Sequence, residues 1–212
     1  MAKCDQVKDF VNKKIGIFSD DQYNKAALPR LRDGIMFKPG KLPYVMSIVL
    51  TDMDPSLCGS NGISPAEIAA YSALTLWATH QQGLDIKSFP MHKKDDPQKD
   101  GPSVGRAAAR LCLAMVDDGK SLSDAKEDAG KKLDALCMSN NADMLFQSLR
   151  KFVFFLNKYE VPMDYALLAR DIYLYCFRDN ISDIKIRWLR DFNKALAPYT
   201  NPCYANPCYA NP

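Results

Sequence analysis

Histidine is scarce in this chain of 212 residues, which contains only His80 and His92. The chain therefore has too few histidines for a His-rich metal site, and few that could activate a cysteine nucleophile. The sequence also lacks the phosphate-binding G-x-x-x-x-G-K-[ST] loop, the G-x-G-x-x-G motif, and the H-E-x-x-H and G-x-S-x-G signatures. We therefore expect no enzyme, no cofactor and no metal site. A lone histidine such as His80 is expected to be a polar residue satisfied near a helix end.

Long apolar runs are missing as well. No stretch approaches the roughly 18 to 20 residues that a membrane-spanning helix needs, and the N-terminus, MAKCDQVKDF, is too polar for a secretory signal. We expect a cytoplasmic protein without membrane contact. The seven cysteines include no C-x-x-C pair, so most of them are expected to be reduced, small core residues.

A strong excess of one charge is also absent. The net charge is +3 and the pI is near 8.4, which permits contact with nucleic acid but does not require it. A nucleic-acid surface would therefore have to come from local clusters of lysine and arginine.

Helical periodicity dominates what the chain does contain. The clearest start signal is S-P-A-E, in which Ser64 caps a helix, Pro65 takes its first position and Glu67 reaches back. The fold class is expected to be all-α, an irregular bundle of about eight helices. The expected helices cover residues 3–15, 20–32, 44–50, 64–82, 103–116, 123–138 and 142–158, followed by two helices between residues 161 and 198.

Two small helical lobes are expected, over residues 1–83 and 102–197. Between them, residues 84–101 are rich in proline, lysine and aspartate without any period, which predicts a long mobile loop. The tail, residues 198–212, repeats NPCYA and is expected to be disordered.

The last two helices are the best-specified part of the sequence. Pro162 suits the first turn of one helix, and Asp179, Asn180 and Ser182 offer stop and cap signals before the next. In the last helix, a rotation of about 100° per residue collects one apolar stripe that must be buried. The stripe consists of Ile181, Ile184, Trp188, Phe192 and Leu196.

Basic residues recur on the outer sides of the C-terminal helices. Arg187, Arg190 and Lys194 lie within about 60° of one another, opposite the apolar stripe. One interpretation is a solvated face held by local charge pairs. Repetition on helix after helix instead favours a surface that follows phosphates. The other basic pairs are Arg106 and Arg110, Lys131 and Lys132, and Arg150 and Lys151.

Phe154 is expected on the outside of its helix, opposite the core residues and beside Lys151 and Lys158. An outward aromatic in this position is either a partner contact or a scattered exposed residue.

The ordered series GPSVGRAAARL, DAGKKLDALCMSNNADMLFQSLRKFV, VPMDYALLARDIYLY and IRWLRDF resembles the small subunit of the type I-E CRISPR Cascade complex, the CasB family. LPRLRDG and ALTLWATHQQG in the N-terminal half are similar to that family too, so the resemblance covers about Ala26 to Ala197. It implies an all-helical, non-catalytic protein that occurs as a head-to-tail pair in the surveillance complex. It also implies that the protein lines the channel for the target strand and stabilises the displaced strand of the R-loop.

The resemblance also adds site residues and partners. It implies contact with the backbone and large subunits of Cascade, with the heteroduplex of CRISPR RNA and target DNA, and with the displaced strand. Ser139, Asn140 and Asn141 stand where some relatives are basic, which weakens that part of the groove. The candidate nucleic-acid-binding residues are Lys93, Lys94, Arg106, Arg110, Lys131, Lys132, Arg150, Lys151, Lys185, Arg187, Arg190 and Lys194.

Two other functions stay open from the residues alone. A helical scaffold or adaptor would use Phe154 and the basic faces to contact protein. A helix-turn-helix regulator would use the short connection between the last two helices and would place Arg187 and Arg190 against DNA.

Overall fold

The computed structural model describes residues 2–93 and 101–200, apart from the side chains of residues 21–25. These residues form nine α-helices, two short 3-10 helices and no β-strand, which confirms the all-α prediction. The α-helices are α1 (Lys3–Phe18), α2 (Asp21–Asp33), α3 (Pro43–Leu50), α4 (Pro65–His80), α5 (Val104–Asp117), α6 (Leu122–Cys137), α7 (Ala142–Lys158), α8 (Tyr165–Tyr175) and α9 (Arg178–Thr200). The 3-10 helices are η1 (Gly34–Met36) and η2 (Pro55–Leu57).

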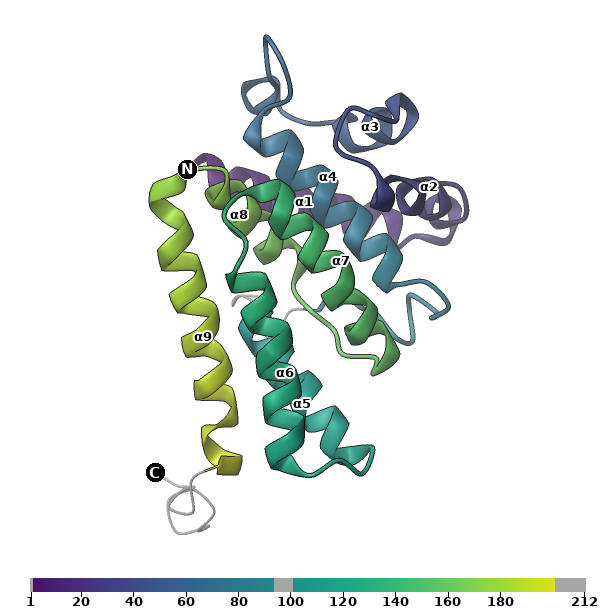
Figure 1. Cartoon of the computed structure of the whole chain (residues 1–212). Helices are drawn as coiled ribbons and strands as arrows, with labels where there is room; N and C mark the ends of the chain where they lie inside the picture. Colours follow the sequence, from purple (N-terminus) through teal and green to yellow (C-terminus); the bar gives the residue numbers. More distant parts are fainter. Residues whose placement is uncertain (1, 94–100, 201–212) are drawn as a thin grey trace, which may run out of the picture.

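Helix α4 lies at the centre of the upper part of the molecule (Figure 1). It packs against α1, α2, α3, α7 and α8, and nearly all of its side chains are buried. The predicted capping box starts this helix. The Glu67 N–H donates to the Ser64 hydroxyl at 3.1 Å, and the Ser64 N–H donates to the Glu67 carboxylate at 2.5 Å. Two N–H groups at the start of the helix are thereby satisfied.

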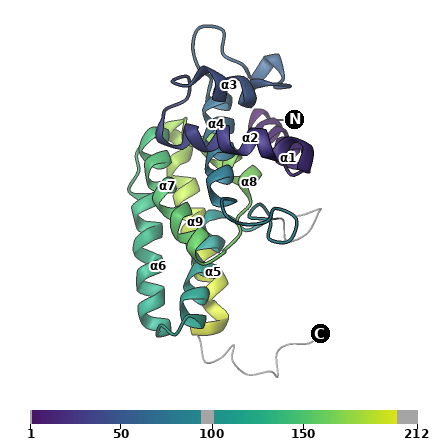
Figure 2. The ribbon, with the colours of Figure 1, turned by 90° about the vertical axis from the view of Figure 1, so that its right-hand side faces the viewer.

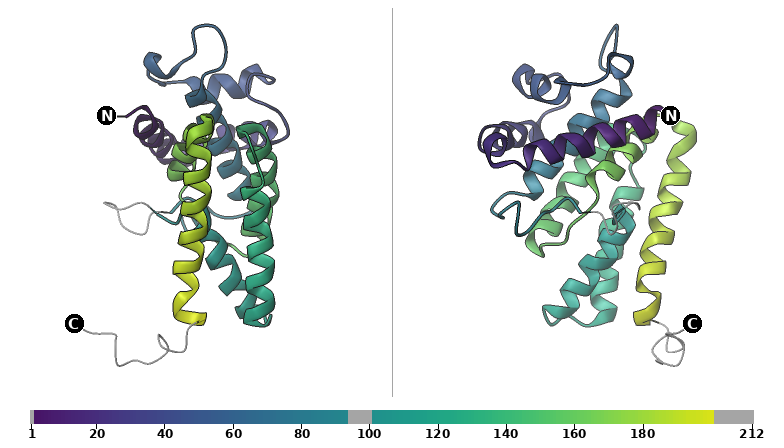
Figure 3. Two further views of the ribbon diagram at one scale, coloured as in Figure 1. Left: turned by 60° about the vertical axis from the view of Figure 1, so that its left-hand side comes forward. Right: turned by 180° about the vertical axis from the view of Figure 1, so that it is seen from behind.

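Helices α5, α6 and α9 form the elongated lower part of the molecule (Figures 1 and 3). Helix α5 packs against both α6 and α9. The apolar stripe predicted for the last helix is buried along α9, which confirms the rotation derived from the sequence. The buried residues of this helix are Ile181, Ile184, Trp188, Phe192 and Leu196.

Helix α8 packs against elements from both halves of the chain. It follows residues 84–101 in sequence, yet it contacts α1 and α4, which precede that segment, as well as α9. Buried side chains from both sides of the segment belong to one cluster. The division into two lobes at residues 84–101 stays a prediction.

Helix α8 begins later than expected. Pro162 does not lie in its first turn, because the helix starts at Tyr165 and Asp164 is its N-cap. The Asp164 carboxylate accepts hydrogen bonds from the N–H groups of Ala166 and Leu167, each at 3.0 Å. A capping carboxylate makes hydrogen bonds to the free N–H groups of the first turn, whereas a proline makes none. The helix therefore begins directly after Asp164 and not at Pro162.

Helix α9 begins earlier than expected. Its first residue is Arg178, so Asp179, Asn180 and Ser182 lie inside the helix and do not cap it. Asp179 stands in the first turn, where its negative charge complements the helix dipole.

Helix α9 also ends later than expected. It continues through Pro198 to Thr200, so the prediction of disorder is wrong for residues 198–200. The proline removes only one backbone donor near the helix end, and the Thr200 hydroxyl donates to the Leu196 carbonyl at 3.1 Å. The rest of the tail, residues 201–212, lies outside the described residues.

The first part of the predicted mobile loop is anchored to the core. Ile86 and Met91 are buried. The carboxamide of Gln81 donates to the carbonyls of Leu84 at 3.2 Å and Phe89 at 3.1 Å, and it accepts from the Met91 N–H at 2.9 Å. The hydrophobic periodicity of the sequence could not reveal this anchor. A single buried glutamine holds an irregular segment in place, and it leaves no repeating pattern in the sequence.

We expect Gly105→Ala to lower the free energy of unfolding by about 1–3 kcal/mol, as other overpacked sites do. Gly105 lies in α5 where α9 crosses it, and a Cβ at this position would stand 2.0 Å from the Trp188 carbonyl oxygen. The two helices would therefore have to move apart. Urea unfolding followed by circular dichroism measures the change.

Gly130→Ala is the matched control. Gly130 lies inside α6, and a Cβ there would meet nothing within 4 Å. This substitution should raise stability by about 0.4–1 kcal/mol, since alanine loses less backbone entropy than glycine on folding. Equal effects at the two glycines would contradict the close packing of α5 on α9.

Candidate nucleic-acid interface

Two of the predicted basic residues meet where α5 and α9 lie side by side. Arg106 and Lys194 line a cleft of about 370 Å³ together with Asp191 and Ala195. The hydroxyl of Ser103, the N-cap of α5, donates to the Asp191 carboxylate and so ties the two helices together. Tertiary packing therefore places an arginine and a lysine from distant parts of the sequence at one opening.

Arg190 lies on the outer side of α9, opposite the buried stripe. A rotation of about 100° per residue places it about 40° from Lys194. Both side chains are exposed. Arg190, Lys194 and Arg106 thus form a basic surface along α9 and its border with α5, which we call the α9 basic surface.

Arg187, which was expected to face outward with Arg190 and Lys194, is partly covered by α8. Its guanidinium pairs with Asp171 of α8, and the Trp188 indole N–H donates to the same carboxylate at 2.7 Å. Asp171 is 1% exposed. Burial raises the pKa of the Asp171 carboxyl, and Arg187 and Trp188 oppose that rise. Arg187 therefore neutralises a buried acid at the α8–α9 contact.

The two lysines predicted on α6 have different surroundings. Lys131 is exposed and pairs with Glu127 at 2.6 Å. The Lys132 ammonium lies 4.2 Å from the centroid of the Phe155 ring of α7. A cation over an aromatic face is attracted electrostatically, so Lys132 helps to hold α6 against α7.

Of the two basic residues predicted on α7, one contacts other side chains and the other is exposed. Arg150 donates to the Gln147 carboxamide at 2.9 Å and also contacts the Met36 sulfur of η1. Lys151 is exposed. Figure 2 shows α6 and α7 on the same side of the molecule, so the exposed Lys131 and Lys151 lie on neighbouring helices.

The remaining candidates lie apart from the α9 basic surface or on its margin. Lys93 is exposed, and its backbone N–H donates to the Met163 carbonyl at 3.3 Å. Lys94 lies outside the described residues. Arg110 is half-buried one turn after Arg106, and Lys185 is half-buried beside Cys137 of α6.

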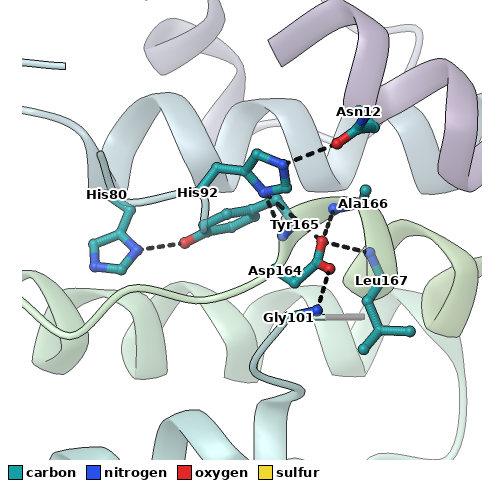
Figure 4. Close-up of polar contacts among 8 residues, drawn as sticks. All are labelled: Asn12, His80, His92, Gly101, Asp164, Tyr165, Ala166 and Leu167. Carbon is teal, nitrogen blue, oxygen red and sulfur yellow. Dashed lines mark hydrogen bonds and ion pairs between the residues drawn. The ribbon is translucent and has the colours of Figure 1, made fainter. Parts of the chain in front are cut away.

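A buried polar junction joins the start of α8 to α1 and to the segments on either side of residues 94–100 (Figure 4). The Tyr165 N–H donates to His92 Nδ1 at 3.1 Å, so Nε2 carries the proton and donates to Asn12 at 3.2 Å. The Asp164 carboxylate accepts the Gly101 N–H at 2.9 Å in addition to its helix-capping bonds. These contacts give His92 and Asp164 structural roles.

His80 is fully buried, and its Nδ1 lies 2.7 Å from the Tyr165 hydroxyl (Figure 4). The expected hydrogen bond of a lone histidine is therefore present, although the side chain lies in the core. Burial lowers the pKa of His80 to about 4. No pattern along the chain pointed to Asp171, the most consequential polar residue that the predictions missed.

Within residues 2–93 and 101–200, no group of three His, Cys, Asp or Glu side chains is arranged to hold a metal ion. Among the described helices, none has both the length and the hydrophobicity that a membrane span requires.

The fold and the α9 basic surface together define an all-helical protein whose C-terminal helices expose cations. The sequence profile of the family described as CRISPR-associated protein Cse2 matches residues 27–192. The chain belongs to this Cse2 family, which confirms the resemblance seen in its ordered motifs. No curated protein matches the chain.

Two solved structures are similar over most of the chain. The crystal structure of CasB from Thermobifida fusca has a TM-score of 0.65 and 26% identity, and the match covers 88% of this chain and 97% of that one. The crystal structure of a CRISPR-associated protein of the Cse2 family from Thermus thermophilus has a TM-score of 0.60 and 19% identity, with 92% and 100% covered. At 19% identity the second structure shows a shared fold.

Proposed function

We propose that this chain is a non-catalytic subunit of a type I-E CRISPR RNA-guided surveillance complex, Cascade. In that complex it binds the backbone of nucleic acid and stabilises the target strand and the displaced strand of the R-loop. Its partners are the backbone and large subunits, the heteroduplex of guide RNA and target DNA, and a second copy arranged head to tail in the cytoplasm. Membership of the Cse2 family supports this role.

The α9 basic surface is the observation that carries backbone binding. Arg190 and Lys194 are exposed on one side of α9, and Arg106 lies across the cleft. In RNA-guided complexes base pairing reads the sequence, so a subunit of this kind needs only charge and shape. The helix-turn-helix alternative is weaker, because Arg187, one of its two arginines, pairs with a buried carboxylate.

The double substitution Arg190→Ala and Lys194→Ala should weaken binding to single-stranded DNA and RNA of unrelated sequence. If each side chain contacts one phosphate, the slope of log affinity against log salt should flatten by about 0.7 per contact, or about 1.4 for the pair. Both side chains are exposed, so stability should change by no more than about 0.5 kcal/mol per site. Fluorescence anisotropy at several salt concentrations measures the slope, and R-loop formation by the assembled complex tests the role in Cascade.

Lys13→Ala combined with Lys41→Ala is the matched control, because it removes the same net charge from exposed positions in the N-terminal part of the chain. This pair should leave the slope nearly unchanged. Equal losses from the two double variants would mean that binding follows net charge alone, and the assignment of the α9 basic surface would be wrong.

A further inference from the structure

The outer side of α7 carries an aromatic ring between two lysines. Lys151, Phe154 and Lys158 lie within about 60° of one another around the helix axis. We call these three residues the α7 stripe. Phe154 is 70% exposed, more than any other aromatic side chain in the described part of the chain. Single exposed apolar side chains are common on protein surfaces, so the groups around Phe154 have to show whether the ring has a role.

A cleft opens beside the Phe154 ring, between α7 and the end of α4. It has a volume of about 370 Å³ and is lined by Thr79, Gln82, Val153, Phe154 and Asn157. The lining therefore combines apolar side chains with hydroxyl and carboxamide groups. This size lies at the lower end of the range of about 300–1,000 Å³ that is usual for ligand sites.

The polar groups of the lining have unused hydrogen-bonding capacity. The Asn157 amide nitrogen donates to the carbonyls of His80 at 2.7 Å and Gln82 at 3.3 Å, which fixes the carboxamide and leaves its oxygen as an acceptor. The Gln82 side chain is exposed and offers both a donor and an acceptor. A ligand in the cleft would thus meet an aromatic face and groups that pair with either donors or acceptors.

We propose that the α7 stripe and this cleft bind a base of single-stranded nucleic acid. The base stacks on Phe154 with its edge toward Gln82 and Asn157, while Lys151 and Lys158 contact the flanking phosphates. This inference rests on the proposed function and adds a stacking contact to its backbone contacts. Stacking is tolerant of sequence, because every base has an aromatic face.

Charge complementarity selects a polyanion as the occupant over an apolar protein segment. Lys151 and Lys158 are both exposed, and they lie one on each side of Phe154 along the helix. The Lys158 ammonium lies 5.0 Å from the centroid of the Tyr159 ring, which keeps the charge close to α7. A ring flanked by two cations combines the two features by which proteins bind single strands, an aromatic stacking platform and positive charge along the backbone.

The test compares binding of the full chain to oligothymidylate and to a chain of abasic sites of the same length. Phe154→Ala should weaken binding to oligothymidylate by about 5-fold to 150-fold, the loss expected for one stacked base. The same substitution should leave binding to the abasic chain unchanged. Phe154→Trp should restore the affinity for oligothymidylate, because tryptophan also offers a face for stacking.

Met138→Ala is the control, since it removes another exposed apolar side chain from a different position; it should leave both affinities unchanged. Equal losses on the two chains, or no loss on either, would overturn the stacking proposal while leaving backbone binding intact. Unchanged affinity for oligothymidylate together with poorer incorporation of Phe154→Ala into the assembled complex would also overturn it, because Phe154 would then contact protein. If the unsubstituted protein binds neither chain, the proposed function itself fails.

Discussion

Arg187→Ala should lower the free energy of unfolding by about 3 kcal/mol, the lower end of the range for breaking a buried ion pair. The substitution leaves the Asp171 carboxylate, which is 1% exposed, without its charged partner. The Arg187 side chain is itself 36% exposed, so water already reaches part of the pair and the upper end of the range is not expected. Urea unfolding at neutral pH measures the loss.

Arg190→Ala is the matched control on the same helix. Arg190 is exposed, so this substitution should change stability by no more than about 0.5 kcal/mol. Arg187→Ala combined with Asp171→Asn should recover part of the loss, because the amide carries no charge yet still accepts the Trp188 indole N–H. Similar stability for the two single variants would show that Arg187 does not neutralise a buried acid.

The loss caused by Arg187→Ala should also shrink in acid. Burial raises the pKa of Asp171, and removing Arg187 removes one of the groups that oppose the rise. The folded variant then binds a proton at Asp171 more tightly than the unfolded chain does, so the contribution of this protonation to stability is fully present below the unfolded pKa of about 3.9 and is lost as the pH rises through the folded value. The measurement is the difference in free energy of unfolding between the variant and the unsubstituted protein. This difference should become smaller from neutral pH toward pH about 4.

Acid should destabilise the protein through His80, by about 2 kcal/mol at pH 5 and about 3 kcal/mol below pH 4. Burial lowers the pKa of His80 from 6.5 to about 4. The unfolded chain therefore takes up the proton first. The stability contributed by neutral His80 is fully present above the unfolded pKa of 6.5 and is lost as the pH falls through about 4.

His80→Asn is the variant that isolates this effect. It removes the titrating ring but keeps a polar side chain near the Tyr165 hydroxyl. Carboxylates that titrate below pH 5 contribute to both proteins, so the difference between the two curves of stability against pH reports His80. Parallel curves between pH 7 and 4 would mean that His80 is hydrated in the folded state.

An experiment on nucleic-acid binding has to take the Arg187–Asp171 pair into account. Loss of binding by an Arg187 variant would report partial unfolding of the α8–α9 contact as readily as loss of a phosphate contact. Arg190 and Lys194 avoid this ambiguity, since both are exposed on α9 and face away from the stripe that contains Trp188.

Features that depend on neighbours along the chain could be predicted from the amino-acid sequence alone. Ser64 and Glu67 form the predicted capping box because both partners lie within one turn of helix. The buried stripe through Trp188 and the exposed position of Phe154 follow from the rotation of about 100° per residue. The family resemblance depended on an ordered series of such local motifs, and the match to the Cse2 family confirms it.

Features that depend on the neighbour across an interface required the folded molecule. Arg187 and Arg190 differ by about 60° around α9, and no local pattern says that α8 covers one of them with a buried aspartate. Likewise, the close approach of α9 to Gly105 depends on another helix. Periodicity fixes the direction of a side chain relative to its own helix axis. Which group meets that side chain depends on long-range packing, and this is why the sequence did not show that Arg187 pairs with the buried Asp171.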